Sequence, residues 1–178
     1  MSRSGYTDDY DEDGTGGLWR GAVTSAIKGK RGQAALVALA EAMDAMPVKT
    51  LAAESLVNAD GEFCTLGVLG AARGMDMSDI DPDDWDQVAK AFGLAPAMVR
   101  EIVYENDERC DGMKWARWEV CGPMRYFYPH WERHSRSGRI PTSEGPGAAR
   151  WKRMRAWVQQ HIDPAAQRVT AREGMKNA

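Results

Sequence analysis

The sequence predicts a mainly α-helical, compact domain with a helix-turn-helix-like corner and room for one short β-hairpin near residues 56–66. Apolar residues recur at helical spacing in several segments, and a glycine or proline follows most of these segments. The chain has 178 residues, which is the size of one ordinary domain. No apolar run approaches the length of a membrane span, so we expect no membrane partner.

Stripes of apolar residues predict the first two helices. Residues 18–27 repeat apolar side chains every three to four positions, and the GKRG sequence at 29–32 interrupts that helix. Residues 34–46 predict a second helix, which a proline ends. The stretch 48–74 fits either two short helices or a hairpin around its NADGE turn, and we favour the helices.

A segment with six aspartates between residues 76 and 86 admits two interpretations. Asp79, Asp81 and Asp83 have the spacing that begins a calcium-binding loop, but the glycine and glutamate that such a loop requires later are missing. As the start of a helix, the segment offers Asp81 as an N-cap and Pro82 in the first turn. The other aspartates would then lie near the positive end of the helix dipole. We therefore expect a helix here.

Residues 88–103 have the spacing of a helix-turn-helix corner. Ala89 is small enough for a second helix to pass close, and Gly93 suits a left-handed turn between the two helices. Arg100 could contact a base, but the residues around it are acidic and offer few groups that read DNA. We therefore interpret the corner as scaffold. Its expected apolar anchors are Val88, Phe92, Leu94, Val99 and Ile102.

Charge divides the chain into two halves. Residues 1–108 carry 9 Lys/Arg against 20 Asp/Glu, whereas residues 109–178 carry 14 against 6. Such a separation either draws the two halves together or gives each half a partner of opposite charge. The predicted organisation is an acidic, disordered arm at 1–17, a helical core at 18–108, a basic and aromatic insertion at 109–149 that is partly loop, and a C-terminal helix and tail at 150–178.

The basic half interleaves aromatic rings with Lys and Arg. This composition can bind single-stranded nucleic acid through backbone charge and base stacking, and it is also typical of protein-binding hot spots. At 150–162 the Trp and Met stripe instead fits a core face, and the sequence at 136–147 predicts a loop. The candidate contacts for nucleic acid or a protein partner are Lys114, Trp115, Arg117, Trp118, Arg125, Trp131, Arg150, Lys152 and Arg153.

No arrangement of residues predicts a catalytic site, a cofactor or a metal centre. The spacing of Cys110, Cys121, His130 and His134 is too wide for a zinc finger. The glycine-rich segments lack the order of a nucleotide-binding loop. The three cysteines have no regular spacing, which favours a reducing cytosol. The candidates for an unspecific anion site near the start of the second helix are Lys28, Lys30 and Arg31.

Five segments carry a family resemblance. They are WRGAVTSAIKGKRGQ at 19–33, GEFCTLGVLGAARGMDMSDIDP at 61–82, AFGLAP at 91–96, EIVYEND at 101–107 and RMRAWV at 153–158. Together they resemble a family of small uncharacterised proteins encoded by tailed phages and prophages of Gram-negative bacteria. Shorter members pass quickly from the EIVYEND segment to the last helix, so residues 109–149 would be an insertion. The resemblance implies a phage accessory protein in the cytoplasm of the bacterial host. Such proteins often bind and block a host protein, including components of host defence.

The function that we expect is non-enzymatic binding to a host macromolecule, with a host protein as the first choice. The predicted contact is an acidic surface that faces a basic patch on that partner. Its residues are Asp83, Asp84, Asp86, Glu101 and Glu105. The alternative is nucleic-acid binding through the basic and aromatic half.

Overall fold

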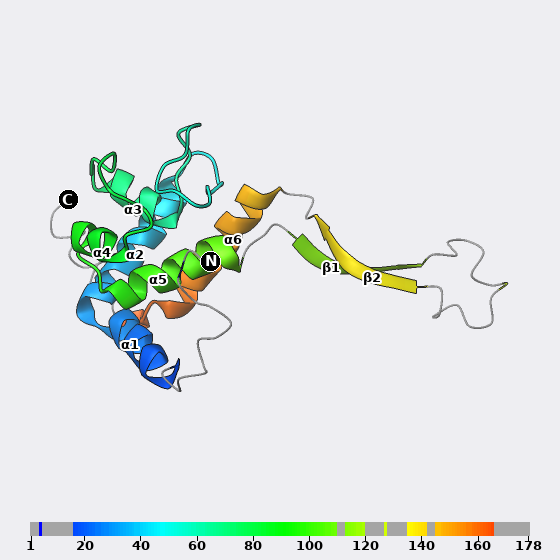
Figure 1. Cartoon of the computed structure of the whole chain (residues 1–178), viewed down its shortest axis with the longest axis horizontal. Coiled ribbons are helices and arrows are strands. Elements are labelled where there is room, and N and C mark those ends of the chain that lie inside the picture. Colours follow the sequence, from blue (N-terminus) through cyan, green and yellow to red (C-terminus); the bar gives the residue numbers. More distant parts are fainter. Residues whose placement is uncertain are drawn as a thin grey trace.

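The computed structural model describes residues 4, 16–109, 113–119, 127, 135–141 and 145–165. Figure 1 shows the helices gathered into one body, from which a two-stranded hairpin projects. The predicted fold class, mainly α-helical and compact, is therefore confirmed. The elements in chain order are α1 (Gly16–Lys28), α2 (Lys30–Ala45), α3 (Thr65–Ala72), α4 (Trp85–Phe92), α5 (Pro96–Val103), the π-helical turn η2 (Tyr104–Glu108), β1 (Met113–Glu119), β2 (Ser135–Pro141) and α6 (Pro146–His161).

Helices α1 and α2 meet at a sharp corner. Only Gly29 separates them, and a Cβ atom at Gly32 would lie 2.1 Å from the carbonyl oxygen of Ala26. The corner therefore requires glycine at position 32, because any side chain would collide with the backbone of α1. Both predicted helices are present, and the GKRG sequence contributes its last three residues to α2 rather than to a loop.

The segment between α2 and α3 differs from the helices that we favoured. Residues 51–64 contain no helix, and a single bridge between Val57 and Phe63 makes a short hairpin-like turn. The side-chain oxygen of Asn58 accepts hydrogen bonds from the backbone N–H groups of Asp60 and Glu62, which closes the turn. The expectation of helices is right for α3 and wrong for this turn, because local side-chain hydrogen bonds outcompeted helix formation.

The helix-turn-helix-like corner is present between α4 and α5. Gly93 adopts a left-handed conformation with φ of 67°, as its position predicted. The N-cap of α4 is Asp84 rather than Asp81, because the Asp84 carboxylate accepts from the backbone N–H groups of residues 86 and 87. All of the predicted apolar anchors are buried, namely Val88, Phe92, Leu94, Val99 and Ile102.

Helix α5 lies inside the helical body. Six of its eight residues are buried, and it contacts α1, α3 and α4. It continues directly into η2, against which α6 packs. Met154 and Val158 of α6 are fully buried, so the apolar stripe at 150–162 is core. Among the helices in the described parts of the chain, none combines the length and the apolar character that crossing a membrane would require.

Strands β1 and β2 form an antiparallel ribbon. The register runs from Met113 opposite Pro141 to Glu119 opposite Ser135. The loop expected at 136–147 is therefore wrong for its first six residues, which belong to β2, and for Pro146 and Gly147, with which α6 begins. Glycine, serine and proline give β2 little strand propensity of its own, so its conformation depends on pairing with β1.

A glycine at the start of α3 provides a test of this packing. A Cβ atom at Gly67 would lie 1.9 Å from the carbonyl oxygen of Leu56, which is backbone and cannot move aside easily. We expect Gly67→Ala to lower the free energy of unfolding by about 2 kcal/mol or more in urea titrations. Gly21→Ala is the matched control, because nothing lies within 4 Å of its Cβ position in α1. It should raise stability by about 0.5–1 kcal/mol. Equal stabilities of the two variants would contradict the packing described.

Candidate protein-interaction site

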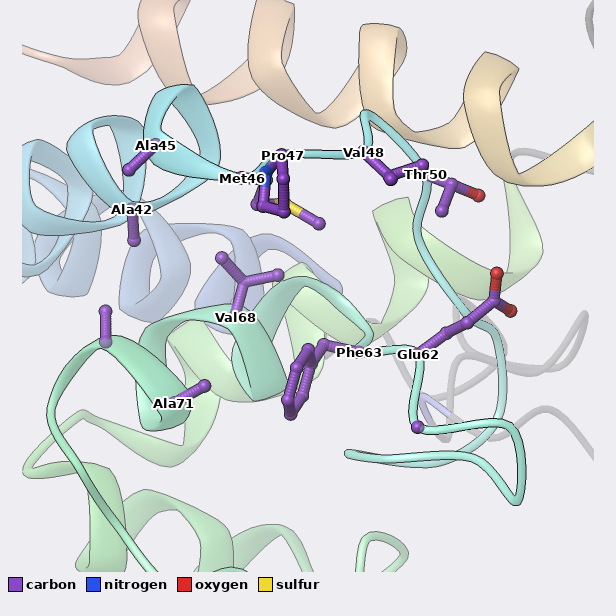
Figure 2. Close-up of a pocket in the computed structure, with 12 residues that line it drawn as sticks. Ala42, Ala45, Met46, Pro47, Val48, Thr50, Glu62, Phe63, Val68 and Ala71 are labelled. Carbon is purple, nitrogen blue, oxygen red and sulfur yellow. The ribbon is translucent and has the colours of Figure 1, made fainter.

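A predominantly apolar surface pocket of about 470 Å³ opens between α2 and α3, and we call it the α2–α3 pocket. Figure 2 shows Val68 of α3 pointing across the pocket toward Met46 and Pro47, with Phe63 just before the start of α3. Val48, on the loop that closes one side, is 64% exposed. The lining residues are Ala42, Ala45, Met46, Pro47, Val48, Thr50, Gly61, Glu62, Phe63, Val68, Ala71 and Ala72.

A buried polar cluster of Thr65, Asn106 and Arg150 fixes the segments that wall this pocket. The Asn106 side-chain oxygen accepts from the backbone N–H of Thr65 at 3.2 Å and from its hydroxyl at 2.7 Å. The Asn106 amide nitrogen donates to the carbonyl oxygen of Ala52 at 3.1 Å. Arg150 of α6 donates to the carbonyl oxygens of Asn106 and Leu51 at 2.9 and 2.8 Å. The cluster thus ties the loop before residue 52, the start of α3, η2 and α6 to one another.

An ion pair joins the end of α2 to α6 beside the pocket. Arg155 donates from Nε and Nη2 to the two carboxylate oxygens of Asp44, at 2.8 and 2.7 Å. The hydrogen bond from Arg155 is the main cause that lowers the pKa of Asp44. The Asp44 side chain is 53% exposed, so solvent screens the pair and its contribution to stability is modest.

Exposed acidic residues outnumber exposed cations next to the pocket. Glu62 lines the pocket, and Asp60 and Glu41 each precede a lining residue in the sequence. All three acidic side chains are exposed. The nearby cations serve other contacts. Lys49 donates to the last carbonyl oxygens of α2 and lies over the ring of Trp151, and Arg73 donates to the carbonyl oxygen of residue 92. The pocket is therefore an apolar hollow with an acidic rim.

The chemistry of the lining favours an apolar guest. Thr50 and Glu62 are the only polar side chains among the lining residues, and Glu62 already accepts a hydrogen bond from Asn58. Pockets that hold small polar molecules usually place several convergent polar groups around the ligand. Here the lining offers no pair of groups arranged as nucleophile and base. An aliphatic or aromatic side chain fits the lining best.

The predicted acidic surface divides into exposed and buried parts. Asp83, Asp84 and Asp86 are exposed at the start of α4, although Asp84 also serves as its N-cap. Glu101 is 7% exposed and lies 3.7 Å from Arg20. Glu105 is 3% exposed. The structure therefore does not place these two glutamates on the acidic surface.

Glu105 has a structural role inside the helical body. Its carboxylate pairs with Arg153 of α6 and with Arg109 one helical turn away. Burial of a carboxylate is favourable only when cations and hydrogen bonds compensate it, and both arginines do so here. The pair with Arg153 therefore contributes to the packing of α6 on η2.

Arg100, the residue of the corner that could have contacted a base, is engaged within the protein. Its guanidinium lies over the rings of Trp19 and Trp85, at 4.3 and 4.4 Å from their centroids. Its Nε donates to the carbonyl oxygen of Ser4, whose own N–H donates to Glu108. Since α5 is also largely buried, it cannot enter a DNA groove as a reading helix. Apart from Ser4 and the start of α1, the predicted arm at 1–17 lies outside the described residues.

The basic and aromatic candidates fall into three groups. Arg150 is buried, Arg153 is half-buried and paired with Glu105, and Lys152 is exposed on α6. Four candidates lie on β1, and Arg117 among them is exposed. The remaining two lie outside the described residues. The four on β1 are Lys114, Trp115, Arg117 and Trp118, and the two outside are Arg125 and Trp131.

The candidate anion site lies at the junction of α1 and α2. Lys28, Lys30 and Arg31 are all exposed. Lys30 and Arg31 line a second hollow of about 520 Å³, together with the first residues of α5. Neither α2 nor α5 has a side-chain N-cap, so two sets of helix-terminal N–H groups adjoin this hollow.

The metal candidates are tested only in part. Cys110, Cys121, His130 and His134 lie outside the described residues. Within the part of the chain that the structure describes, no group of three or more His, Cys, Asp or Glu side chains has the geometry to hold a metal ion.

Sequence reasoning missed the α2–α3 pocket. Its lining comes from four separate segments between residues 42 and 72, and most of the lining residues are alanines or belong to short loops. Small apolar residues on helices are common on surfaces and give no signal by themselves. The one usable signal was the apolar Pro47 and Val48 pair in a loop, next to an acidic turn.

No protein-family model matches this chain, and comparison with curated proteins and with solved structures finds no significant relative of either kind.

The buried polar cluster predicts a large effect of one substitution. Asn106→Ala removes the partners of the Thr65 hydroxyl, the Thr65 N–H and the Ala52 carbonyl, which stay buried. We expect a loss of about 2–4 kcal/mol in the free energy of unfolding, measured by urea titration. Gln160→Ala, on the exposed side of α6, is the control and should change stability by less than about 0.5 kcal/mol. A small effect of Asn106→Ala would mean that the cluster does not hold the pocket walls.

The pair between Asp44 and Arg155 predicts a pH dependence. The pKa of Asp44 is lower in the folded chain than in the unfolded chain, so its stabilisation is present above the unfolded value and is lost as pH falls through the folded value. Asp44→Asn should lower stability by about 0.5–1 kcal/mol at pH 7. The difference from the wild type should begin to shrink as pH falls to about 4, the unfolded value, and should vanish only below the lower folded value. Urea titrations at several pH values measure it, and a difference that persists or grows in acid would refute the assignment.

Proposed function

We propose that this protein acts by non-enzymatic binding to a host protein, and that the α2–α3 pocket receives an apolar anchor side chain of that partner. The observation that carries the proposal is an apolar pocket of about 470 Å³ with an acidic rim. Helix-in-groove recognition uses such hollows, in which an amphipathic segment inserts aliphatic or aromatic side chains. The acidic rim favours Lys and Arg on either side of the anchor.

The exposed aspartates at the start of α4 are a second acidic feature that could attract the partner. Asp83 and Asp86 are exposed on the same acidic segment. A partner with a basic patch would be steered toward this side of the protein, and steering of this kind raises association rates more than it raises final affinity. Asp84 contributes charge as well, but its capping role makes it unsuitable for a clean test.

The biological setting rests on the sequence resemblance. It suggests a phage or prophage accessory protein in the cytoplasm of a Gram-negative host. A protein of this kind would act by occupying a surface of a host component, and a component of host defence is the candidate target. No catalytic group is required for that mode of action.

The pocket can be probed directly with a photo-crosslinking amino acid. Placed at Ala71, which lines the pocket and is exposed, benzoylphenylalanine should capture a discrete host protein from a nuclease-treated Gram-negative lysate. Placed at Ala34, which is exposed near the other end of α2, it should capture nothing at comparable yield. Identical adducts from both positions, or none from Ala71, would count against the pocket as a partner site.

Substitutions then test the chemistry of the captured complex. Ala71→Arg should weaken partner binding about tenfold or more, because it places a charge in the apolar hollow, whereas Ala34→Arg should change it less than about twofold. Glu41→Lys with Glu62→Lys should slow association most strongly at low salt. Binding measured by surface plasmon resonance separates the two effects. Unchanged affinity in Ala71→Arg would place the contact elsewhere.

A further inference from the structure

The β1–β2 ribbon is the feature of the structure that the proposed function leaves unused. Figure 1 shows it extending away from the helical body. The two strands pair over seven residues each. A two-stranded ribbon without a supporting layer has little stability of its own in water, so an element of this kind gains most from contact with a partner.

The ribbon and the helical body carry opposite charge. Residues 113–119 and 135–141 contain four Lys/Arg and one Glu, whereas residues 16–109 and 145–165 of the body contain 13 Lys/Arg and 16 Asp/Glu. Helix α6 comes from the basic half of the sequence but lies in the body, so the body is only weakly acidic. A polyanion would be attracted most strongly to the ribbon, where Lys and Arg outnumber Glu four to one.

The register distributes the exposed arginines over both faces of the ribbon. Arg117 lies opposite Ser137, and Arg136 is the neighbour of Ser137 along β2. Because successive residues of a strand point to opposite faces, Arg117 and Arg136 project to different sides. Both side chains are exposed. A flat protein surface would contact one face only, whereas a nucleic-acid groove places phosphates on both sides of whatever enters it.

We propose that the β1–β2 ribbon is a DNA-binding arm that enters the major groove of duplex DNA. That groove is about 12 Å wide and admits a two-stranded ribbon, whereas the major groove of double-stranded RNA is too deep and narrow. Arg117 and Arg136 contact phosphates on the two sides of the groove, since a guanidinium can bond a phosphate through two N–H groups. This inference goes beyond the proposed protein contact and does not depend on it.

The test is the affinity of the full chain for a 20-base-pair DNA duplex of mixed sequence, measured by fluorescence anisotropy between 50 and 200 mM salt. Arg117→Ala with Arg136→Ala should reduce the affinity about tenfold or more at the lowest salt. The slope of log affinity against log salt should become shallower by about two, which corresponds to two lost phosphate contacts. Thermal unfolding of the variant, measured alongside, separates a loss of affinity from a loss of folded protein.

The matched control is Arg20→Ala with Lys90→Ala, which removes the same charge from exposed positions of α1 and α4. It should change the affinity less than about twofold. Absence of duplex binding by the wild type, or equal losses in the two double variants, would overturn the proposal. Tighter binding of single-stranded DNA or double-stranded RNA would overturn entry into the DNA major groove. The photo-crosslinking result at Ala71 is independent of all these outcomes.

Discussion

The buried amide of Asn106 is the constraint on which the candidate site depends. One side chain satisfies the N–H and hydroxyl of Thr65 and the carbonyl of Ala52, and its own backbone carbonyl receives Arg150. These bonds connect the first turn of α3, the loop that follows α2, and α6. Because α3 and the loop after α2 are walls of the pocket, the polar cluster that holds these two segments also helps to set the shape of the pocket. A buried network of this kind is stable only when every member is satisfied, which couples its segments into one unit.

Charged residues, like the buried polar cluster, also connect separate elements of the helical body. Arg100, Glu105, Arg150 and Arg153 each connect elements of the helical body, so these four charges serve internal contacts. The charges that remain at the surface are distributed unevenly. Acidic residues flank the α2–α3 pocket and precede α4, while the exposed arginines Arg117 and Arg136 lie on the ribbon. The two proposed contacts, which have opposite electrostatic preferences, would thereby lie on separate parts of one chain.

Sequence patterns predicted the elements that rest on local rules. Helix α2 follows from its apolar spacing, and Gly93 from the need for a positive φ between α4 and α5. The sequence could not distinguish Asp84 from Asp81 as the N-cap, because neighbouring aspartates have the same capping preference. The residue at which α4 begins decides between them. Strand β2 was missed because its residues have weak strand propensity, and its partner strand lies some twenty residues earlier in the chain.

What the sequence by itself determined is the helical character of the chain, the position of the corner and the separation of charge between its halves. These properties depend on composition and on short sequence periodicities, both of which are already present in the unfolded chain. Only the tertiary structure decided which charges are surface and which are core, and that a pocket exists. The rings that hold Arg100 come from positions 19 and 85, and the pocket lining spans residues 42 to 72. Burial is a property of neighbours that distant segments supply, so no local pattern encodes it.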